Sequence, residues 1–156
     1  MRTFADTTGR EWKVDVNVGT CKRVKTLLPG TDLLDVAGGD LLCRLASDPI
    51  LLCDVLYVVV KPQADAEGVS DEAFGQALGG DALEAATTAL LEALSDFFPS
   101  AKRRVLQKAL VKLRALENRV ADAAEARLEG KALERELDAL LAGSGASSTD
   151  TPESLA

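Results

Sequence analysis

The first sixteen residues alternate apolar and polar side chains around a short turn-forming stretch, residues 7–10. Trp12, Val14 and Val16 alternate with charged residues, and Gly9 lies within the turn. A period of two places one set of side chains on a single face of a strand, and glycine supplies the positive φ that short loops require. The pattern predicts a β-hairpin over residues 1–16. Its apolar face is expected to pack on helices, because an isolated hairpin is marginally stable in water.

From residue 17 to residue 142, apolar residues recur at intervals of three and four, with capping residues before each stretch and glycine or proline after most of them. The expected N-caps, whose side-chain oxygens accept from the free N–H groups of a first helical turn, are Asn17, Asp48, Ser70 and Asp81. The expected helices cover residues 17–28, 32–47 with a break at Gly38 and Gly39, 50–61, 70–78, 81–98, 99–129 and 132–142.

The stretch 55–60, VLYVVV, has the β-branched composition of a strand. Asp48 and Pro49 upstream of it are helix-start signals, and the length of the segment suits a helix. We therefore predict a helix over residues 50–61, followed by a loop over residues 62–68. Apolar residues surround this helix, which indicates burial on several sides, either in the middle of the fold or against a partner.

The longest expected helix, residues 99–129, is roughly 45 Å long at 1.5 Å per residue, which is longer than a compact domain of this size needs. An apolar seam with spacings of three and four runs along it and fades at Arg127: Leu106, Ala109, Leu113, Leu116, Val120 and Ala123. Residues 143–156 are small and polar and are expected to form a disordered tail. The sequence thus predicts a mainly α fold in one domain, residues 1–142, with a small N-terminal β-hairpin followed by a helical bundle with a long C-terminal helix.

Composition narrows the class of protein. The chain has 156 residues, a formal net charge of -7 and no histidine. Its longest unbroken apolar run, residues 55–60, is far shorter than the roughly 20 residues that span a bilayer, so no membrane partner is expected. No secretory signal pattern follows Met1, which favours an intracellular protein. Three cysteines without metal-binding spacing, Cys21, Cys43 and Cys53, are expected to be buried free thiols.

Charge is unevenly distributed. Residues 31–98 are strongly acidic, whereas residues 99–116 contain six cations and no acid: Lys102, Arg103, Arg104, Lys108, Lys112 and Arg114. This basic block indicates either contact with nucleic acid or an acidic partner, or neutralisation by the acidic region or by another subunit. No aromatic residue is interleaved with the cations, and the chain as a whole is acidic, so nucleic acid is not expected as a partner.

Chemistry-bearing motifs are weak. The two Gly-Gly-Asp sequences, at residues 38–40 and 79–81, match neither the dinucleotide-binding nor the P-loop pattern and are interpreted as helix ends. The acidic stretch 65–72 lacks the ligand spacing of a calcium loop. Without histidine, no serine in the chain has the usual general base. We therefore expect no catalytic residues, no metal, no cofactor and no enzymatic activity.

Four segments carry a family resemblance: TFADTTGREWKVDVNV, TDLLDVAGGDLL, the stretch from DPILLCDVLYVVV to ALLEAL, and DFFPSAKRRVL. In order and composition they resemble tail assembly chaperones of tailed phages and prophages over about residues 3–116. The resemblance implies a small β element before a helical body and a cytoplasmic protein of the host cell. It also implies binding to the long, helical, hydrophobic tape measure protein before tail tube subunits replace it. Some members of the family also make a longer form by translational frameshift.

The expected partner-binding residues lie on the apolar helix 50–61, at the end of helix 81–98 and on the long helix: Leu51, Val55, Val58, Val59, Phe97, Phe98, Leu106, Leu113 and Leu116. The alternative is that the same side chains form the core of the chain or the seam of a homo-oligomer. Residues 117–141 extend beyond the resemblance, which leaves open a structural tail or connector component of a phage-like particle. A helical regulator or adaptor from a mobile element is a third hypothesis.

Overall fold

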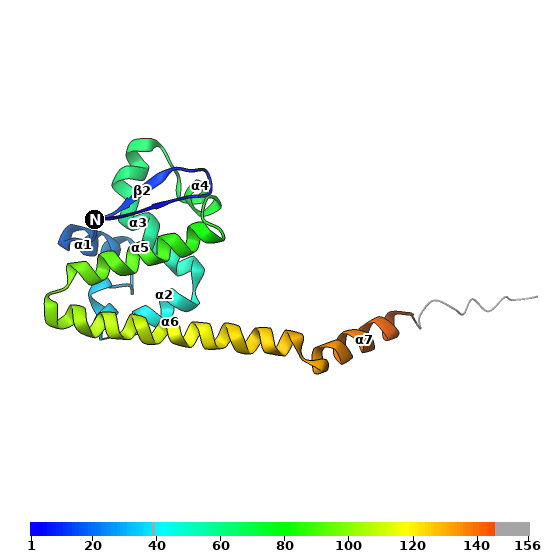
Figure 1. The fold of residues 1–156 in the computed structure, drawn as a ribbon. Helices are drawn as coiled ribbons and strands as arrows, with labels where there is room; N and C mark the ends of the chain where they lie inside the picture. Colours follow the sequence, from blue (N-terminus) through cyan, green and yellow to red (C-terminus); the bar gives the residue numbers. More distant parts are fainter. Residues whose placement is uncertain (39, 146–156) are drawn as a thin grey trace, which may run out of the picture. The chain divides into compact units, whose positions relative to one another are not determined.

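The computed structural model describes residues 1–38 and 40–145, and in these residues the predicted mainly α fold is confirmed (Figure 1). An antiparallel hairpin precedes the helices. The elements in chain order are β1 (Arg2–Ala5), β2 (Glu11–Val14), α1 (Val18–Leu27), the 3-10 helix η1 (Leu33–Ala37), α2 (Leu41–Ser47), α3 (Pro49–Glu67), α4 (Asp71–Gln76), α5 (Asp81–Phe97), α6 (Ser100–Glu129) and α7 (Lys131–Gly145).

The chain divides into two compact units, Met1–Val111 and a second unit that begins at Lys112. The sequence predicts one domain over residues 1–142. Helix α6 contributes its first part to the first unit and the rest to the second. Residues 143–145 of the expected tail continue helix α7 instead, and residues 146–156 lie outside the described part of the chain.

The hairpin packs its alternating apolar face inward. In the register of the two strands, Phe4 pairs with Trp12 and Arg2 pairs with Val14. Phe4, Trp12 and Val14 are buried, and the turn passes through Gly9 at a φ of +86°. In the first unit, strand β1 lies along α5 and β2 packs against α3 (Figure 1). The hairpin therefore gains from the helices the support that it lacks alone.

Three of the four expected N-caps are confirmed by hydrogen bonds. The side chain of Asn17 accepts from Thr20 N–H, that of Asp48 accepts from the N–H groups of Ile50 and Leu51, and that of Ser70 accepts from Ala73 N–H. The expectation for Asp81 is wrong by one residue. Gly80, with a φ of +53°, holds the cap position, and Asp81 is the first helical residue. There its carboxylate still interacts favourably with the positive end of the helix dipole.

Helix α3 extends beyond the predicted range. The helix over residues 50–61 is confirmed, but the expected loop at 62–68 is wrong, because α3 continues through Pro62 to Glu67. Proline has no N–H to donate to the carbonyl four residues earlier, which is that of Val58. Arg23 on α1 supplies the missing donor, since its Nη1 lies 3.0 Å from Val58 O and 3.2 Å from Val59 O. The helix ends at Glu67, and the next residue, Gly68, adopts the left-handed conformation typical of a helix C-terminus.

Helix α3 forms the centre of the first unit. It contacts α1, α2, α4, α5 and β2. Leu56 and Val60 are almost fully buried, and the ring of Phe74 on α4 packs against Trp12 and Tyr57 with centroid distances of 5.1 and 5.5 Å. The predicted burial of this helix on several sides is confirmed, with the chain's own elements supplying the cover.

The three cysteines differ in their exposure to solvent. All three cysteines are free, but only Cys21 is buried; Cys53 is half-buried and Cys43 is exposed, so the expectation of burial is wrong for Cys43. Residue 43 lies on the outer side of the short helix α2, whose buried residues are Leu41, Leu42 and Leu45.

None of the helices in the described part of the chain has an apolar stretch long enough to cross a lipid bilayer.

Candidate functional site

The structure separates the expected partner-binding residues into two groups. Five of them lie in the core of the chain: Val55, Val58, Val59, Phe98 and Leu106. In this conformation a partner does not reach them, so for these five side chains the core interpretation holds and the expected contact set is corrected. The cause is that apolar periodicity is the same whether a helix packs on its own chain or on another.

The other expected residues retain solvent access. Leu51, Phe97 and Leu113 are half-buried, and Leu116 is 51% exposed. Two more apolar side chains on the second part of α6 are exposed, although they were not among the expected partner-binding residues. Val120 and Leu128 are 63% and 64% exposed. We call Leu116, Val120 and Leu128, which lie on one side of the helix, the α6 stripe.

Helix α7 carries a similar exposed row. Leu137 and Leu140 are 50% and 72% exposed, and Leu133 is half-buried. Their spacings of four and three place them on one side of the helix. We call these three leucines the α7 stripe. The helical periodicity of the sequence located this row, but the expected contact set did not include it.

One cation of the basic block, Arg103, forms hydrogen bonds within the fold. Arg103 donates through Nε to Ser95 O at 3.2 Å and through Nη2 to Asp96 O at 3.1 Å. These carbonyls belong to the last turn of α5, where free acceptors and the negative end of the helix dipole favour a cation. Arg103 therefore joins the start of α6 to the end of α5.

The remaining cations of the block are exposed, and none of them forms an ion pair with a described residue of its own unit: Lys102, Arg104, Lys108, Lys112 and Arg114. The acidic region pairs with other cations. Glu92 and Asp96 bind Arg2 at 3.3 and 2.9 Å, and Asp32 binds Lys25 at 3.4 Å. Within the first unit, no ion pair joins Lys102, Arg104 or Lys108 to an acidic side chain of residues 31–98.

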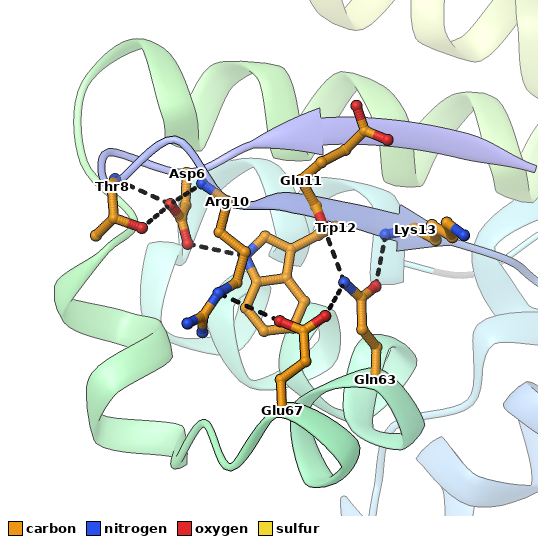
Figure 2. Close-up of polar contacts among 8 residues, drawn as sticks. All are labelled: Asp6, Thr8, Arg10, Glu11, Trp12, Lys13, Gln63 and Glu67. Atoms are coloured by element: carbon orange, nitrogen blue, oxygen red, sulfur yellow. Dashed lines mark hydrogen bonds and ion pairs between the residues drawn. The ribbon is translucent and has the colours of Figure 1, made fainter.

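A second polar cluster closes the hairpin turn (Figure 2). The Oδ1 atom of Asp6 accepts from Thr8 N–H at 2.9 Å, from Thr8 Oγ1 at 2.6 Å and from Arg10 N–H at 3.1 Å. Its Oδ2 atom accepts from Nε1 of Trp12 at 2.9 Å. Burial of the carboxyl raises its pKa, but these four donors outweigh burial, so the pKa of Asp6 lies below its ordinary value.

The outer edge of β2 is closed by one amide side chain. Gln63 Nε2 donates to Glu11 O at 2.9 Å, and Lys13 N–H donates to Gln63 Oε1 at 3.0 Å (Figure 2). The amide thus bonds to both main-chain groups as a neighbouring strand does. Glu67, which accepts from Gln63 Nε2 at 2.9 Å, also pairs with Arg10 at 3.2 Å. These contacts fix the hairpin on α3 and blunt an edge that otherwise invites pairing with another chain.

Asp6 is expected to make stability depend on pH in the acid range. Its pKa in the folded chain is lowered from 3.8, so its stabilising effect is fully present above about pH 4 and is lost as the pH falls through the folded-state pKa. The free energy of unfolding lost in Asp6→Asn should therefore be largest at neutral pH and shrink toward about pH 3. Urea unfolding at several pH values measures the difference, with the exposed Asp122→Asn as the matched control. A loss that is constant over this pH range contradicts the role given to the carboxylate.

The described residues contain no group of three or more histidine, cysteine, aspartate or glutamate side chains placed to hold a metal ion. Comparisons of the chain with protein-family models, with curated proteins and with solved structures found no match. The features of the described chain that are available to a partner are the exposed α6 and α7 stripes and the exposed cations of α6.

Proposed function

We propose that the chain is a tail assembly chaperone of a tailed phage or prophage. In this role it binds the helical tape measure protein in the host cytoplasm and keeps it soluble until the tail tube assembles. The proposal is supported by the order of the four segments over about residues 3–116 and by the exposed apolar side chains of the second unit. The function is one of binding and involves no catalytic residue.

The observation that carries the proposal is the pair of exposed stripes. A tape measure protein consists of long amphipathic helices that expose apolar surface while they wait for the tube. An amphipathic helix binds another through side chains on one side of the helix; those of the α7 stripe are spaced four and three apart and those of the α6 stripe four and eight apart. Full burial of a leucine or valine side chain contributes about 1.5–3 kcal/mol, so a few anchors give binding that tube subunits can displace. Leu116, Val120 and Leu128 on α6 and Leu137 and Leu140 on α7, all at least half exposed, are such anchors.

Net charge suits the same role. The chain carries a formal charge of -7. Complexes of this chain with an apolar partner therefore repel one another and stay in solution. A chaperone that covers apolar stripes without such repulsion would join its partner in aggregates.

The prediction for this function concerns the α6 stripe. Co-expression with the tape measure protein of the same phage or prophage should raise the soluble fraction of that protein several-fold. The double variant Leu116→Glu, Val120→Glu should lose most of this effect, because two charges replace two anchors. The soluble fraction is measured by centrifugation and quantitative gel analysis.

The matched control is Val18→Glu, Ile50→Glu. These side chains are 59% and 74% exposed, and both lie in the first turn of a helix, where glutamate is tolerated. The control should keep the wild-type effect. A wild-type chain that does not change the soluble fraction excludes the chaperone function, and equal loss in both double variants excludes the α6 stripe as the contact.

A structural tail or connector component is the second candidate. It is favoured by the seam of α6, where the exposed Leu116 and Val120 continue a pattern of three and four that suits pairing between copies. Mass spectrometry of purified particles distinguishes the two functions. A chaperone is absent from the particle, whereas a structural component is present at a fixed copy number.

A further inference from the structure

We propose that the exposed side of α6 in the first unit binds an acidic helical segment of a partner protein. This surface, which we call the basic α6 surface, consists of Arg104, Val105, Lys108 and Val111. It is distinct from the α6 stripe, and the argument for it holds whether or not the chain is a tail chaperone.

The geometry of α6 places the four side chains together. Residues 104, 105, 108 and 111 are spaced one, three and three apart, which in an α-helix puts them on one side. Val105 and Val111 are 56% and 69% exposed, and both cations are exposed. Other side chains in the same part of α6 hold the helix on the first unit: Leu106 is fully buried, and Arg103 donates hydrogen bonds to carbonyls at the end of α5. The basic α6 surface is therefore held in place and free to contact a partner.

The charges of this surface have no compensation in the described chain. Arg104 and Lys108 lie one turn apart, and like charges at this spacing destabilise a helix by about 0.2–0.5 kcal/mol. No acid occurs in residues 99–116, and neither cation forms an ion pair with a described residue. Carboxylates of a partner would remove the repulsion, and arginine binds a carboxylate through two parallel hydrogen bonds. Charge complementarity thus selects an acidic partner.

The exposed valines favour a protein over a nucleic acid as the partner of this surface. Val105 and Val111 flank the two cations and offer apolar surface that phosphates cannot use. Nucleic-acid surfaces for single strands combine cations with aromatic rings, and the basic α6 surface has none. A helix with leucine or alanine on one side and glutamates one turn apart along its flank matches both the valines and the cations, and helix surfaces pack against one another through such rows.

The test uses the full chain and two labelled synthetic peptides with the same apolar side, one flanked by glutamates at i and i+4 and the other by lysines. Fluorescence anisotropy measures the Kd of each at two salt concentrations. We expect the glutamate peptide to bind at least about tenfold more tightly, with the difference falling as salt screens the charges. Equal affinity for the two peptides, or no binding of either, overturns the proposal.

Variants then locate the contact. Arg104→Glu, Lys108→Glu should invert the preference, whereas Arg119→Glu, Arg127→Glu, which makes the same change in charge at exposed positions further along α6, should keep it. Circular dichroism of each variant verifies the fold. Inversion in both double variants means that net charge alone selects the peptide, which overturns the assignment to this surface.

A final set of measurements separates a helical protein from other acidic partners. Val105→Ser, Val111→Ser should weaken binding of the glutamate peptide about tenfold while its salt dependence stays the same, because apolar contacts are not screened. A DNA duplex that binds more tightly than the peptide assigns the surface to nucleic acid and overturns the proposal. Light scattering that detects a dimer broken by Arg104→Glu, Lys108→Glu assigns it to a second copy and also overturns it.

Discussion

Replacement of Trp12 by alanine is expected to lower the free energy of unfolding by about 3–5 kcal/mol, the largest effect of any single substitution considered for this chain. Trp12 is 0% exposed and packs edge-on against Phe74 at 5.1 Å. Its Nε1–H also satisfies one oxygen of Asp6, and alanine leaves that oxygen with one donor fewer in a buried site. Urea unfolding followed by circular dichroism measures the change, since the variant has lost the only tryptophan of the chain.

Trp12→Phe divides this effect into packing and hydrogen bonding. Phenylalanine keeps most of the apolar contact with Phe74 but cannot donate to Asp6, so its cost is expected to be about 1–3 kcal/mol. If Trp12→Ala costs no more than a typical surface substitution, about 0.5 kcal/mol, the packing of the hairpin on the helices does not stabilise the first unit.

The second large effect is expected at Arg23. Its substitution by alanine leaves the carbonyls of Val58 and Val59 without the donor that replaces the missing N–H of Pro62. Hydrogen bonds from a charged donor contribute about 1.5–3 kcal/mol, and we expect the free energy of unfolding to fall by about that amount. The neighbouring Lys22→Ala, at an exposed position, is the matched control, with an expected change below about 0.5 kcal/mol.

A double-mutant cycle tests the reason for this effect. Pro62→Ala restores a main-chain N–H that can donate to Val58 O, so Arg23→Ala should cost about 1 kcal/mol less in that background than in the wild-type chain. If the cost of Arg23→Ala is the same in both backgrounds, Arg23 stabilises the chain by some means other than compensation for the proline.

The elements that the sequence located depend on short-range interactions. Asn17, Asp48 and Ser70 bond to N–H groups two or three residues away, so the residue type and its position suffice to predict the cap. The alternation around Trp12 predicts the hairpin for the same reason. The prediction for Asp81 was wrong by one residue because a glycine in the left-handed region took the cap position, a choice that depends on the loop before the helix.

Other features depend on residues that are distant in the sequence. A proline normally ends a helix, but α3 continues through Pro62, and Arg23, 35 residues before Val58, donates to the Val58 carbonyl that the proline leaves without a main-chain donor. Likewise, nothing near Gln63 in the sequence indicates that its amide pairs with β2, 50 residues before it. Such contacts form only when the chain has folded.

The sequence by itself determined the mainly α class, the N-terminal hairpin, most helix starts and the basic block of α6, because each follows from local spacing, capping and charge. Only the tertiary structure decided which apolar faces are covered, since apolar residues recur at intervals of three and four both around Leu106, which is in the core, and around Leu116 and Val120, which are at the surface. It also decided that the acidic region leaves Arg104 and Lys108 unpaired, because ion pairs depend on distances of a few ångströms between groups that the sequence places far apart.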